Sequence, residues 1–308
     1  MNGADRPWIG FVGLGRMGGP MAANLVATGH RVRGFDVVPE ACEVAAATGV
    51  EIAAGVAEVA AAAEVVVTML PNGGLVRGCY AGEAGILAAA RPGCLLIDCS
   101  TIDVFEAREL QADARGAGMR AIDAPVSGGV VGATAATLTF MAGGEAEEVA
   151  AAEPALLAMG SRVVHCGPSG AGQAAKACNN MLLAISMIGT AEAFALAERL
   201  GLSDQALFDV ASTSSGRCWA LDTNCPVPGP VPTSPANRDY EPGFAIDLMV
   251  KDLRLADAAV RSTGAVTELG RHATEIYERL AERGMGGRDF SVVYRAIVEG
   301  EEDRGGAA

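Results

Sequence analysis

A glycine-rich turn near the start of the chain constrains its fold most strongly. The apolar run Trp8–Val12 has the composition of a buried strand, and the turn Gly13-Leu-Gly-Arg-Met-Gly18 follows it at once. A helical pattern then runs to Gly29, and a second strand, Arg31–Phe35, ends in Asp36. A glycine pattern alone is weak, but this one lies between a strand and a helix, with an acidic residue about 20 positions further on, as dinucleotide binding requires.

Each part of this motif has a physical role toward a dinucleotide. The glycines let the backbone approach a pyrophosphate at a helix N-terminus, whose dipole favours anions. Asp36 is suited to accept hydrogen bonds from the adenosine ribose hydroxyls and to repel a 2′-phosphate, which favours NAD over NADP. We therefore expect NAD as the cofactor. The residues of this motif expected to bind it are Gly13, Leu14, Gly15, Arg16, Met17, Gly18 and Asp36.

Strand and helix patterns alternate through the rest of the first half. Helices are expected at 104–117 and 145–159, between further strands at 65–69, 94–98, 120–123, 138–142 and 162–165. This alternation predicts an α/β fold with a Rossmann-type, doubly wound and mostly parallel sheet. Ligands bind beyond the carboxyl ends of such strands, so Leu70, Pro71 and Thr101 are expected to face the cofactor.

The turn Ser127-Gly128-Gly129, which follows the strand at 120–123, allows two interpretations. It could simply end a strand. Alternatively, a hydroxyl group and exposed backbone N–H groups together can hold a carboxylate in a small nest. The turn alone does not decide between them.

A long apolar stretch at 169–200 begins the second half. It contains no proline and is dominated by alanine, leucine and methionine, which predicts one long helix. Because the helix is apolar nearly all round, we expect it to be buried. Lys176, Asn179 and Asn180 near its start shorten the apolar run, which argues against a membrane span.

Lysine is rare in this chain. Of 23 lysine and arginine residues only Lys176 and Lys251 are lysines, and Lys176 is the one formally charged residue between Arg162 and Glu192. Arginine stays protonated in proteins, whereas a lysine amine changes its protonation state readily when it is desolvated. Composition bias could explain the count, but a lone lysine on an apolar helix favours the interpretation that an amine is needed there.

Lys176 and Asn180 lie four residues apart and therefore share one face of the predicted helix. A lysine that exchanges a proton with a substrate oxygen, next to an amide, fits interconversion of an alcohol and a carbonyl. The alternative is that the asparagine only bridges two helices. Lys251 and Asp252 could likewise be a surface pair on a later helix.

The remainder of the chain is predicted to be helical at 203–212, 244–262, 267–283 and 290–299. The interruption at 213–243 is rich in proline and carries Trp219, with Phe244 directly after it. It could be a stiffened linker. Its aromatic residues favour a packed loop that covers a pocket.

Composition limits the possible functions. The formal net charge is −14 and the pI is near 4.7, which excludes a broad nucleic-acid-binding surface. The eight cysteines include no Cys-x-x-Cys pair, so we expect no metal site and reduced thiols in a cytoplasmic protein. None of the three histidines has the sequence surroundings expected of the catalytic base of a dehydrogenase. This again favours a lysine as the acid or base.

Four motifs in order resemble the β-hydroxyacid dehydrogenase family. They occupy 11–25, 123–129, 172–180 and 251–253, and the segments 224–229 and 240–244 resemble its 3-hydroxyisobutyrate branch. The resemblance covers nearly the whole chain. It implies an NAD-binding Rossmann domain at 6–168, then a long helix that leads into an all-α substrate and oligomerisation domain at 169–300. Independently of the resemblance, the acidic segment 301–308 is expected to be a disordered tail. It also implies a homodimer or homotetramer.

The same resemblance implies an activity and site residues. The expected reaction is oxidation of 3-hydroxyisobutyrate, a small carboxylate, to methylmalonate semialdehyde with NAD in valine breakdown. Lys176 corresponds to the catalytic lysine, and Lys251 and Asp252 correspond to residues near the nicotinamide. Leu75 departs from the family, because relatives often place a polar cofactor contact there. The residues expected to bind substrate are Ser127, Gly128, Gly129, Asn180, Trp219 and Phe244.

Two other functions remain open at this point. One is a sibling activity, such as tartronate or succinic semialdehyde reductase. Those enzymes often prefer NADPH, against which Asp36 argues. The other is a dinucleotide-binding interaction protein without catalysis, against which the presence of Lys176 argues.

Overall fold

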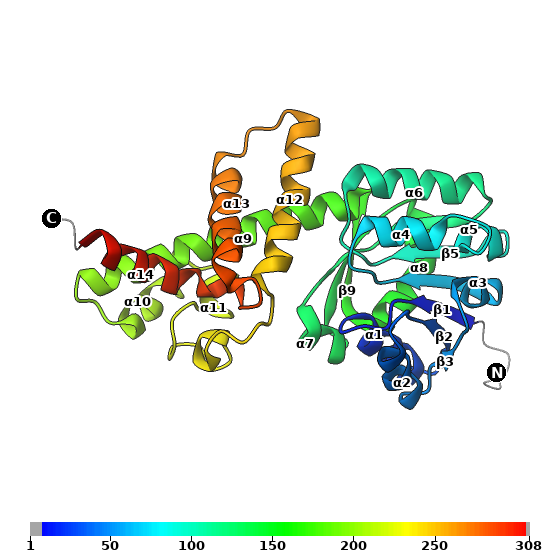
Figure 1. Ribbon diagram of the computed structural model, residues 1–308, viewed down its shortest axis with the longest axis horizontal. Coiled ribbons are helices and arrows are strands. Elements are labelled where there is room, and N and C mark those ends of the chain that lie inside the picture. The colour runs from blue at the N-terminus through cyan, green and yellow to red at the C-terminus, as the bar shows by residue number, and fades with distance from the viewer. Residues whose placement is uncertain (1–7, 306–308) are drawn as a thin grey trace. The chain divides into compact units, whose positions relative to one another are not determined.

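The computed structural model describes residues 8–305, and side chains through residue 299. The chain divides after Lys176 into two compact units, which are drawn in Figure 1 and described separately below.

The first unit is built on a mostly parallel sheet, as predicted (Figure 1). Within the described residues the strand order is β3-β2-β1-β4-β5-β6-β8-β7, and β9 pairs with β8. The β1 to β6 pairings are parallel, whereas β8 runs antiparallel to β6 and β7. The strands are β1 (Trp8–Val12), β2 (Arg31–Phe35), β3 (Glu51–Ile52), β4 (Ala63–Thr68), β5 (Leu95–Asp98), β6 (Arg120–Asp123), β7 (Val126–Ser127), β8 (Leu138–Gly143) and β9 (Gly160–Gly167).

Helices cover both faces of this sheet and enclose two separate cores. Successive side chains of a strand point to opposite faces, so in β5 Leu95 and Ile97 enter one core and Leu96 the other. Strands buried on both faces appear as continuous apolar runs, which is how the sequence revealed them. The helices are α1 (Gly18–Ala27), α2 (Pro39–Ala47), α3 (Val56–Ala61), α4 (Gly73–Tyr80), α5 (Ile86–Ala89), α6 (Val104–Gly116), α7 (Gly129–Thr134) and α8 (Ala146–Met159).

A single long helix, α9 (Ala171–Arg199), joins the two units, as predicted. The expectation that it is buried all round was wrong, because 44% of its most apolar window is buried and Leu182 and Leu196 are exposed. Neighbouring elements of this chain cover only part of its circumference. Among the described residues it is also the one helix whose length and apolar content would suffice to cross a membrane, as those of a core helix often do.

The described part of the second unit is helical. Its main core lies where α9 meets α12 and α13, and includes Met187, Met249 and Tyr277. After α9 the elements are α10 (Asp204–Ala211), α11 (Trp219–Asp222), η2 (Pro235–Arg238), α12 (Ile246–Thr263), α13 (Glu268–Leu280), the π-helical η3 (Ala281–Met285), η4 (Phe290–Val292) and α14 (Val293–Gly305).

The proline-rich segment 213–243 is packed rather than a flexible linker. The Tyr240 hydroxyl donates to the Pro226 carbonyl at 2.8 Å, and the Ser234 hydroxyl donates to the Cys225 carbonyl at 2.5 Å. Backbone N–H groups of Gly243 and Phe244 both donate to the Asp289 carboxylate at 3.0 Å. These bonds hold the segment against the rest of the second unit.

At the end of the chain, α14 continues to Gly305 and so enters the segment 301–308, which the sequence predicts to be disordered. Glutamate and arginine are strong helix formers, so its charged composition is also compatible with a final helical turn. Residues 6 and 7 of the predicted first domain and residues 306–308 lie outside the described residues.

Candidate active site

The first turn places its three glycines in different surroundings. Gly13 has φ +94°, and a Cβ there would lie 2.3 Å from the Met69 carbonyl oxygen. A Cβ on Gly18 would lie 1.9 Å from the Gly13 carbonyl oxygen, so α1 packs closely on the turn. A Cβ on Gly15 would meet nothing within 4 Å. This is the arrangement that a dinucleotide needs, with one glycine for the turn, one for close approach of the pyrophosphate and one for packing.

The start of α1 is suited to an anion. No side chain caps its N-terminus, which begins at Gly18 after the exposed Gly15 and Arg16. Backbone N–H groups at an uncapped helix start attract phosphate through their partial positive charge. Leu14 and Met17 complete the turn. The residues present therefore fit the pyrophosphate of a dinucleotide.

Asp36 is fixed directly beside this turn. Its Oδ2 accepts from the Leu14 N–H at 2.7 Å, and its Oδ1 accepts from the Val38 N–H at 2.9 Å. The carboxylate is half-buried, so it has lone pairs left for ribose hydroxyls. The next two side chains, Val37 and Val38, are exposed and apolar. They offer a 2′-phosphate no positive charge.

Buried polar side chains tie together the carboxyl ends of β4, β5 and β6. Ser100 Oγ accepts from the Leu70 N–H at 2.9 Å, next to the exposed Pro71. Thr68 Oγ1 donates to Asp98 Oδ1 at 2.7 Å, and Asp98 lies level with Asp123 in the neighbouring strand. This network fixes the strand ends that the fold rule assigns to the cofactor.

Asp98 is the exception within this network. Its Oδ2 is buried and has no hydrogen-bond partner among the described residues. Burial raises the pKa of its carboxyl to about 6; hydrogen bonds from Ser100 and Thr68 oppose the rise, and the charge of Asp123 adds to it. Asp98 could not be singled out from the sequence, because Thr68 and Asp123 come from other strands.

The Ser127 turn has the backbone that the nest interpretation requires. Ser127 ends β7 and is half-buried, Gly128 is exposed, and the two glycines after Ser127 have φ +135° and +60°. A Cβ on Gly128 would also lie 3.1 Å from Leu138 Cδ2. Glycine is therefore required, and the N–H groups of Gly128 and Gly129 adjoin the hydroxyl-bearing side chain of Ser127.

Lys176 reaches the same turn from α9. Its Nζ donates to the Val126 carbonyl at 3.0 Å, and Val126 immediately precedes Ser127. The lysine side chain is buried, with 8% of the residue exposed. The structure thus brings the predicted amine and the predicted carboxylate nest together within the first unit.

Sequence reasoning assigned no role to Gln173 and Asp123, although both lie in motifs quoted above. The Asp123 carboxylate accepts from the Gly170 N–H at 2.8 Å and the Gln173 N–H at 2.7 Å, at the start of α9. Burial raises the pKa of Asp123 above its usual value, and these bonds, with one from Gln111, oppose the rise. The one signal available in the sequence was that Gln173 is a polar residue at the start of a helix that is otherwise mostly apolar.

In the second unit, Asn180 and Asp252 form a buried pair. Asn180 Nδ2 donates to Asp252 Oδ2 at 2.5 Å, and Asn180 Oδ1 accepts from Asn179 Nδ2 at 3.0 Å. Lys251 Nζ lies 3.7 Å from Asp252 Oδ1. Asn180 therefore does bridge α9 and α12, and Asp252 is a buried partner rather than half of a surface pair.

Trp219 and Phe244 differ in their surroundings. Trp219 begins α11 with 53% of the residue exposed. Phe244 is half-buried and packs edge-on against Phe290, with ring centroids 5.8 Å apart. Leu75 in α4 is exposed, and its N–H donates to the Asn72 side chain that caps the helix.

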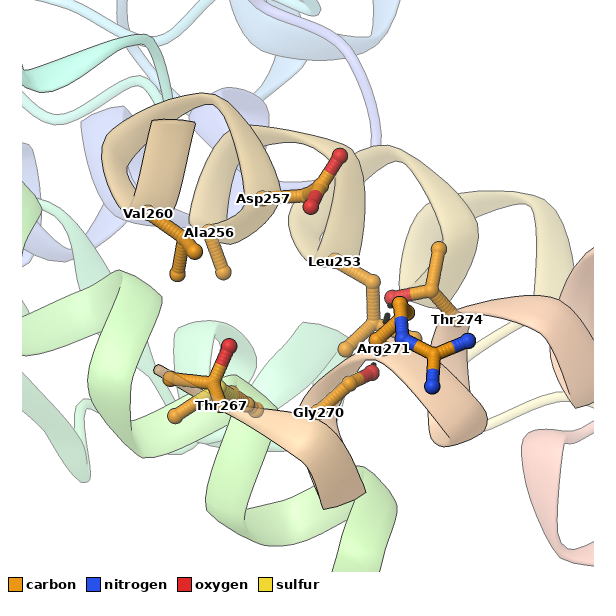
Figure 2. Close-up of a pocket in the computed structure, with 9 residues that line it drawn as sticks. Leu253, Ala256, Asp257, Val260, Thr267, Gly270, Arg271 and Thr274 are labelled. Atoms are coloured by element: carbon orange, nitrogen blue, oxygen red, sulfur yellow. Dashed lines mark hydrogen bonds between the residues drawn. The ribbon is translucent and has the colours of Figure 1, made fainter. Parts of the chain in front are cut away.

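A small pocket in the second unit is separate from all these residues (Figure 2). It lies where α12, α13 and α9 meet, and a Cβ on Gly270 would lie 2.6 Å from Met181 Sδ, so the helices are in close contact. None of the predicted site residues lines it. The lining residues are Met181, Leu253, Ala256, Asp257, Val260, Thr267, Gly270, Arg271 and Thr274.

Comparison with known proteins agrees with this geometry. Residues 8–167 match the family model described as the NAD binding domain of 6-phosphogluconate dehydrogenase. Residues 170–297 match the model described as NAD-binding of NADP-dependent 3-hydroxyisobutyrate dehydrogenase. The fold and the glycine turn thus define an oxidoreductase that uses an NAD-type cofactor.

Individual relatives show which family of oxidoreductases this chain resembles. A probable 3-hydroxyisobutyrate dehydrogenase of Mycobacterium tuberculosis is 56% identical over 289 residues, covering 94% of this chain and 97% of the relative. The solved structure of Mycobacterium tuberculosis 3-hydroxyisobutyrate dehydrogenase with L-serine superposes with a TM-score of 0.91 at 55% identity, covering 95% of this chain and 99% of that one. An NAD-dependent L-serine dehydrogenase of Pseudomonas aeruginosa is 46% identical, covering 93% of this chain and 96% of the relative. The chain belongs to the 3-hydroxyisobutyrate dehydrogenase family.

Proposed function

We propose that this protein oxidises 3-hydroxyisobutyrate to methylmalonate semialdehyde with NAD, as a step of valine breakdown. The observation that carries the proposal is the buried amine of Lys176, held 3.0 Å from the Val126 carbonyl at the start of the Ser127 turn. One side chain that can accept a proton thus lies beside a backbone that can hold a carboxylate. The names of the relatives supply the substrate class.

In the proposed mechanism, Ser127 and the N–H groups of Gly128 and Gly129 hold the substrate carboxylate. The bond from Lys176 to the Val126 carbonyl orients the amine, so that its lone pair, in the neutral form, accepts the proton of the substrate hydroxyl. A bound NAD would supply the acceptor for the hydride that leaves the carbon carrying this hydroxyl. We also propose the roles that the sequence resemblance implies for the second unit: Asn180, Trp219 and Phe244 toward the substrate, and Lys251 and Asp252 toward the cofactor.

NAD rather than NADP is the proposed cofactor, although the family model of the second half is described with NADP. The Asp36 carboxylate is fixed beside the glycine turn by two backbone bonds, so it meets any 2′-phosphate as a like charge. The exposed Val37 and Val38 offer no compensating cation. We also propose a cytoplasmic enzyme that forms a homodimer or homotetramer.

L-Serine is a second candidate substrate. One relative is an L-serine dehydrogenase, and the solved relative contains L-serine. Serine shares the carboxylate and the primary hydroxyl of 3-hydroxyisobutyrate and differs in carrying an ammonium group instead of a methyl group. The same lysine chemistry would serve both.

The first experiment measures reduction of NAD and NADP by the purified protein. The substrates are 3-hydroxyisobutyrate, L-serine, 3-hydroxypropionate, glycerate and 4-hydroxybutyrate. Highest kcat/KM for 3-hydroxyisobutyrate with NAD is expected. Preference for serine would leave the proposed lysine chemistry in place but make L-serine the substrate. Preference for NADP would overturn the role given to Asp36. No turnover with NAD still bound would favour a non-catalytic binding protein.

The role of Lys176 is tested by Lys176→Arg. Arginine keeps the positive charge but cannot serve as a base, so turnover should fall roughly 10²–10⁴-fold, the usual contribution of a positioned acid or base. Affinity for NAD, measured by titration calorimetry, should stay within a few-fold of the original. Turnover close to that of the unmodified enzyme would show that another group takes the proton.

A further inference from the structure

The side chain of Gln173 makes an unusual pair of contacts. Its Oε1 accepts from the Ile102 N–H at 3.1 Å, and its Nε2 donates to the Ser100 carbonyl at 2.7 Å. These two backbone groups lie on either side of Thr101. Gln173 is 1% exposed, and a buried amide is stable only when both of its ends are bonded. The amide therefore fixes the backbone around Thr101 to α9.

The backbone of Gln173 is fixed as well. Its N–H donates to Asp123 Oδ2 at 2.7 Å, at the end of β6. Ser100, whose carbonyl receives the amide, also accepts from the Leu70 N–H at the end of β4. Gln173 thus joins the carboxyl ends of three adjacent strands to the first turn of α9.

Lys176 lies three residues after Gln173 on the same helix, a rise of about 4.5 Å along the helix axis. The strand ends at Leu70 and Thr101 are the expected positions of the cofactor. A displacement between these strand ends and α9 would therefore change the distance from the cofactor to the lysine amine. Gln173 bonds α9 to the backbone on both sides of Thr101 and so opposes such a displacement there.

We infer that Gln173 is a positioning residue for hydride transfer, which sets the separation between the cofactor-facing backbone at Thr101 and the Lys176 amine. This inference rests on the proposed function, in which Lys176 takes the hydroxyl proton. Gln173 touches neither reacting group. It acts through the backbone of Ser100 and Ile102 on one side and through α9 on the other.

Gln173→Met tests the inference, with Gln111→Met as the matched control. Gln111 is also a buried glutamine of the same network. Its side chain donates to Asp123 Oδ1 at 2.6 Å and accepts from Arg115, so these bonds do not reach the backbone around Thr101. Both variants lose a buried amide and should lose similar stability toward urea. Only Gln173→Met should lose turnover, by roughly 10–100-fold, the effect expected of a misplacement near 1 Å.

The measurement is kcat with the best substrate of the panel above, and the isotope effect when the carbon that gives up the hydride carries deuterium. Gln173→Met should raise the isotope effect, because hydride transfer becomes rate-limiting, while the Kd for NAD changes less than about threefold. A kcat within threefold of that of Gln111→Met overturns the inference.

Gln173→Glu provides a second readout that does not depend on the stability of the methionine variant. A protonated glutamic acid can donate to the Ser100 carbonyl and accept from the Ile102 N–H, whereas the carboxylate can only accept. The ratio of its kcat to that of the unmodified enzyme should therefore fall as the pH rises. A ratio independent of pH also overturns the inference.

The two proposals fail in different ways. If Lys176→Arg turns over as fast as the unmodified enzyme, the proposed role of the lysine itself is contradicted. Low turnover in Lys176→Arg combined with control-like turnover in Gln173→Met contradicts only the positioning role of Gln173.

Discussion

Gly15 and Gly18 belong to one motif, yet substitution at Gly15 should weaken NAD binding and substitution at Gly18 should lower stability. A Cβ on Gly15 projects into open space, so Gly15→Ala should unfold at the same urea concentration as the original but bind NAD at least tenfold more weakly, because the methyl group occupies the path of the pyrophosphate. Gly18→Ala should lose roughly 1–3 kcal/mol of unfolding free energy, the usual effect of overpacking. Calorimetric NAD titration and urea unfolding separate the two, and unchanged NAD affinity in Gly15→Ala would place the pyrophosphate elsewhere.

Asp98 makes stability depend on pH. Its folded pKa of about 6 lies above the value near 3.9 of an unfolded aspartate, so the folded state holds the proton more tightly. The resulting stabilisation is fully present below pH 4 and is lost as the pH rises through 6. Two pKa units correspond to roughly 3 kcal/mol.

Asp98→Asn should remove this dependence while its Oδ1 still accepts from Thr68 and Ser100. Between pH 4 and pH 7.5 the unfolding free energy of the variant should therefore rise by roughly 2–2.5 kcal/mol relative to that of the original. Urea unfolding of both proteins across this pH range measures the difference. Parallel curves would mean that Asp98 stays ionised throughout.

Residues of the site were predictable where their signal was local. The turn from Gly13 to Gly18, Asp36 and Lys176 each stood out within a short window. Gln173 did not, because its backbone partners lie 71 and 73 positions away in the chain. A hydrogen bond of that span leaves no periodicity or spacing in the sequence.

Among the elements, a long or sharply bounded apolar run decided what could be predicted. The strands β1, β2 and β6 and the helix α9 were placed closely, because their apolar patterns are long or sharply bounded. The short β3, β7, α3, α5 and α7 were missed, because a few residues do not establish a period. The burial of α9 was overestimated for a related reason, since apolar composition does not show how many neighbours a helix has.

The side chain of Asp289, which caps the start of η4, bonds to the packed segment 213–243. This buried carboxylate accepts from the N–H groups of Gly243 and Phe244, and from Asn224 Nδ2 at 3.1 Å. Asp289→Ala should lower the unfolding free energy by about 3 kcal/mol or more, because several buried donors lose a charged acceptor together. Urea unfolding provides the measurement.

Asp239→Asn is the control for this prediction. Asp239 lies in the same segment and pairs with Arg288 and Arg295, but it is exposed, and exposed ion pairs contribute little. Its substitution should change stability far less than Asp289→Ala. Equal losses would mean that the segment is held by its surface charges.

At the scale of the whole molecule, the two units share α9 but not their cores. If the first unit unfolds, it releases only the residues of α9 before 177, and the rest of the helix keeps its contacts with α12 and α13. We therefore expect the second unit to remain folded when the first unfolds. The chain has two tryptophans, Trp8 in the first unit and Trp219 in the second, which can report on the units separately.

The cofactor should distinguish the units in a thermal experiment. Most proposed NAD contacts, from Gly13 to Thr101, lie in the first unit. At 100 times its Kd, NAD adds about 2.7 kcal/mol to the state that binds it, or roughly 5–10 °C in Tm for a unit of this size. In Trp219→Phe, the fluorescence of Trp8 should show this full shift.

In Trp8→Phe, the fluorescence of Trp219 should show less than half of that shift, because only Lys251 and Asp252 are proposed to contact the cofactor from the second unit. Lys251→Met should reduce this remaining part, because Asp252 is then the one proposed cofactor contact left in the second unit. Equal shifts at both tryptophans would contradict the expectation and show that the units unfold together, with α9 transmitting the stabilisation from the glycine turn to the core around Tyr277.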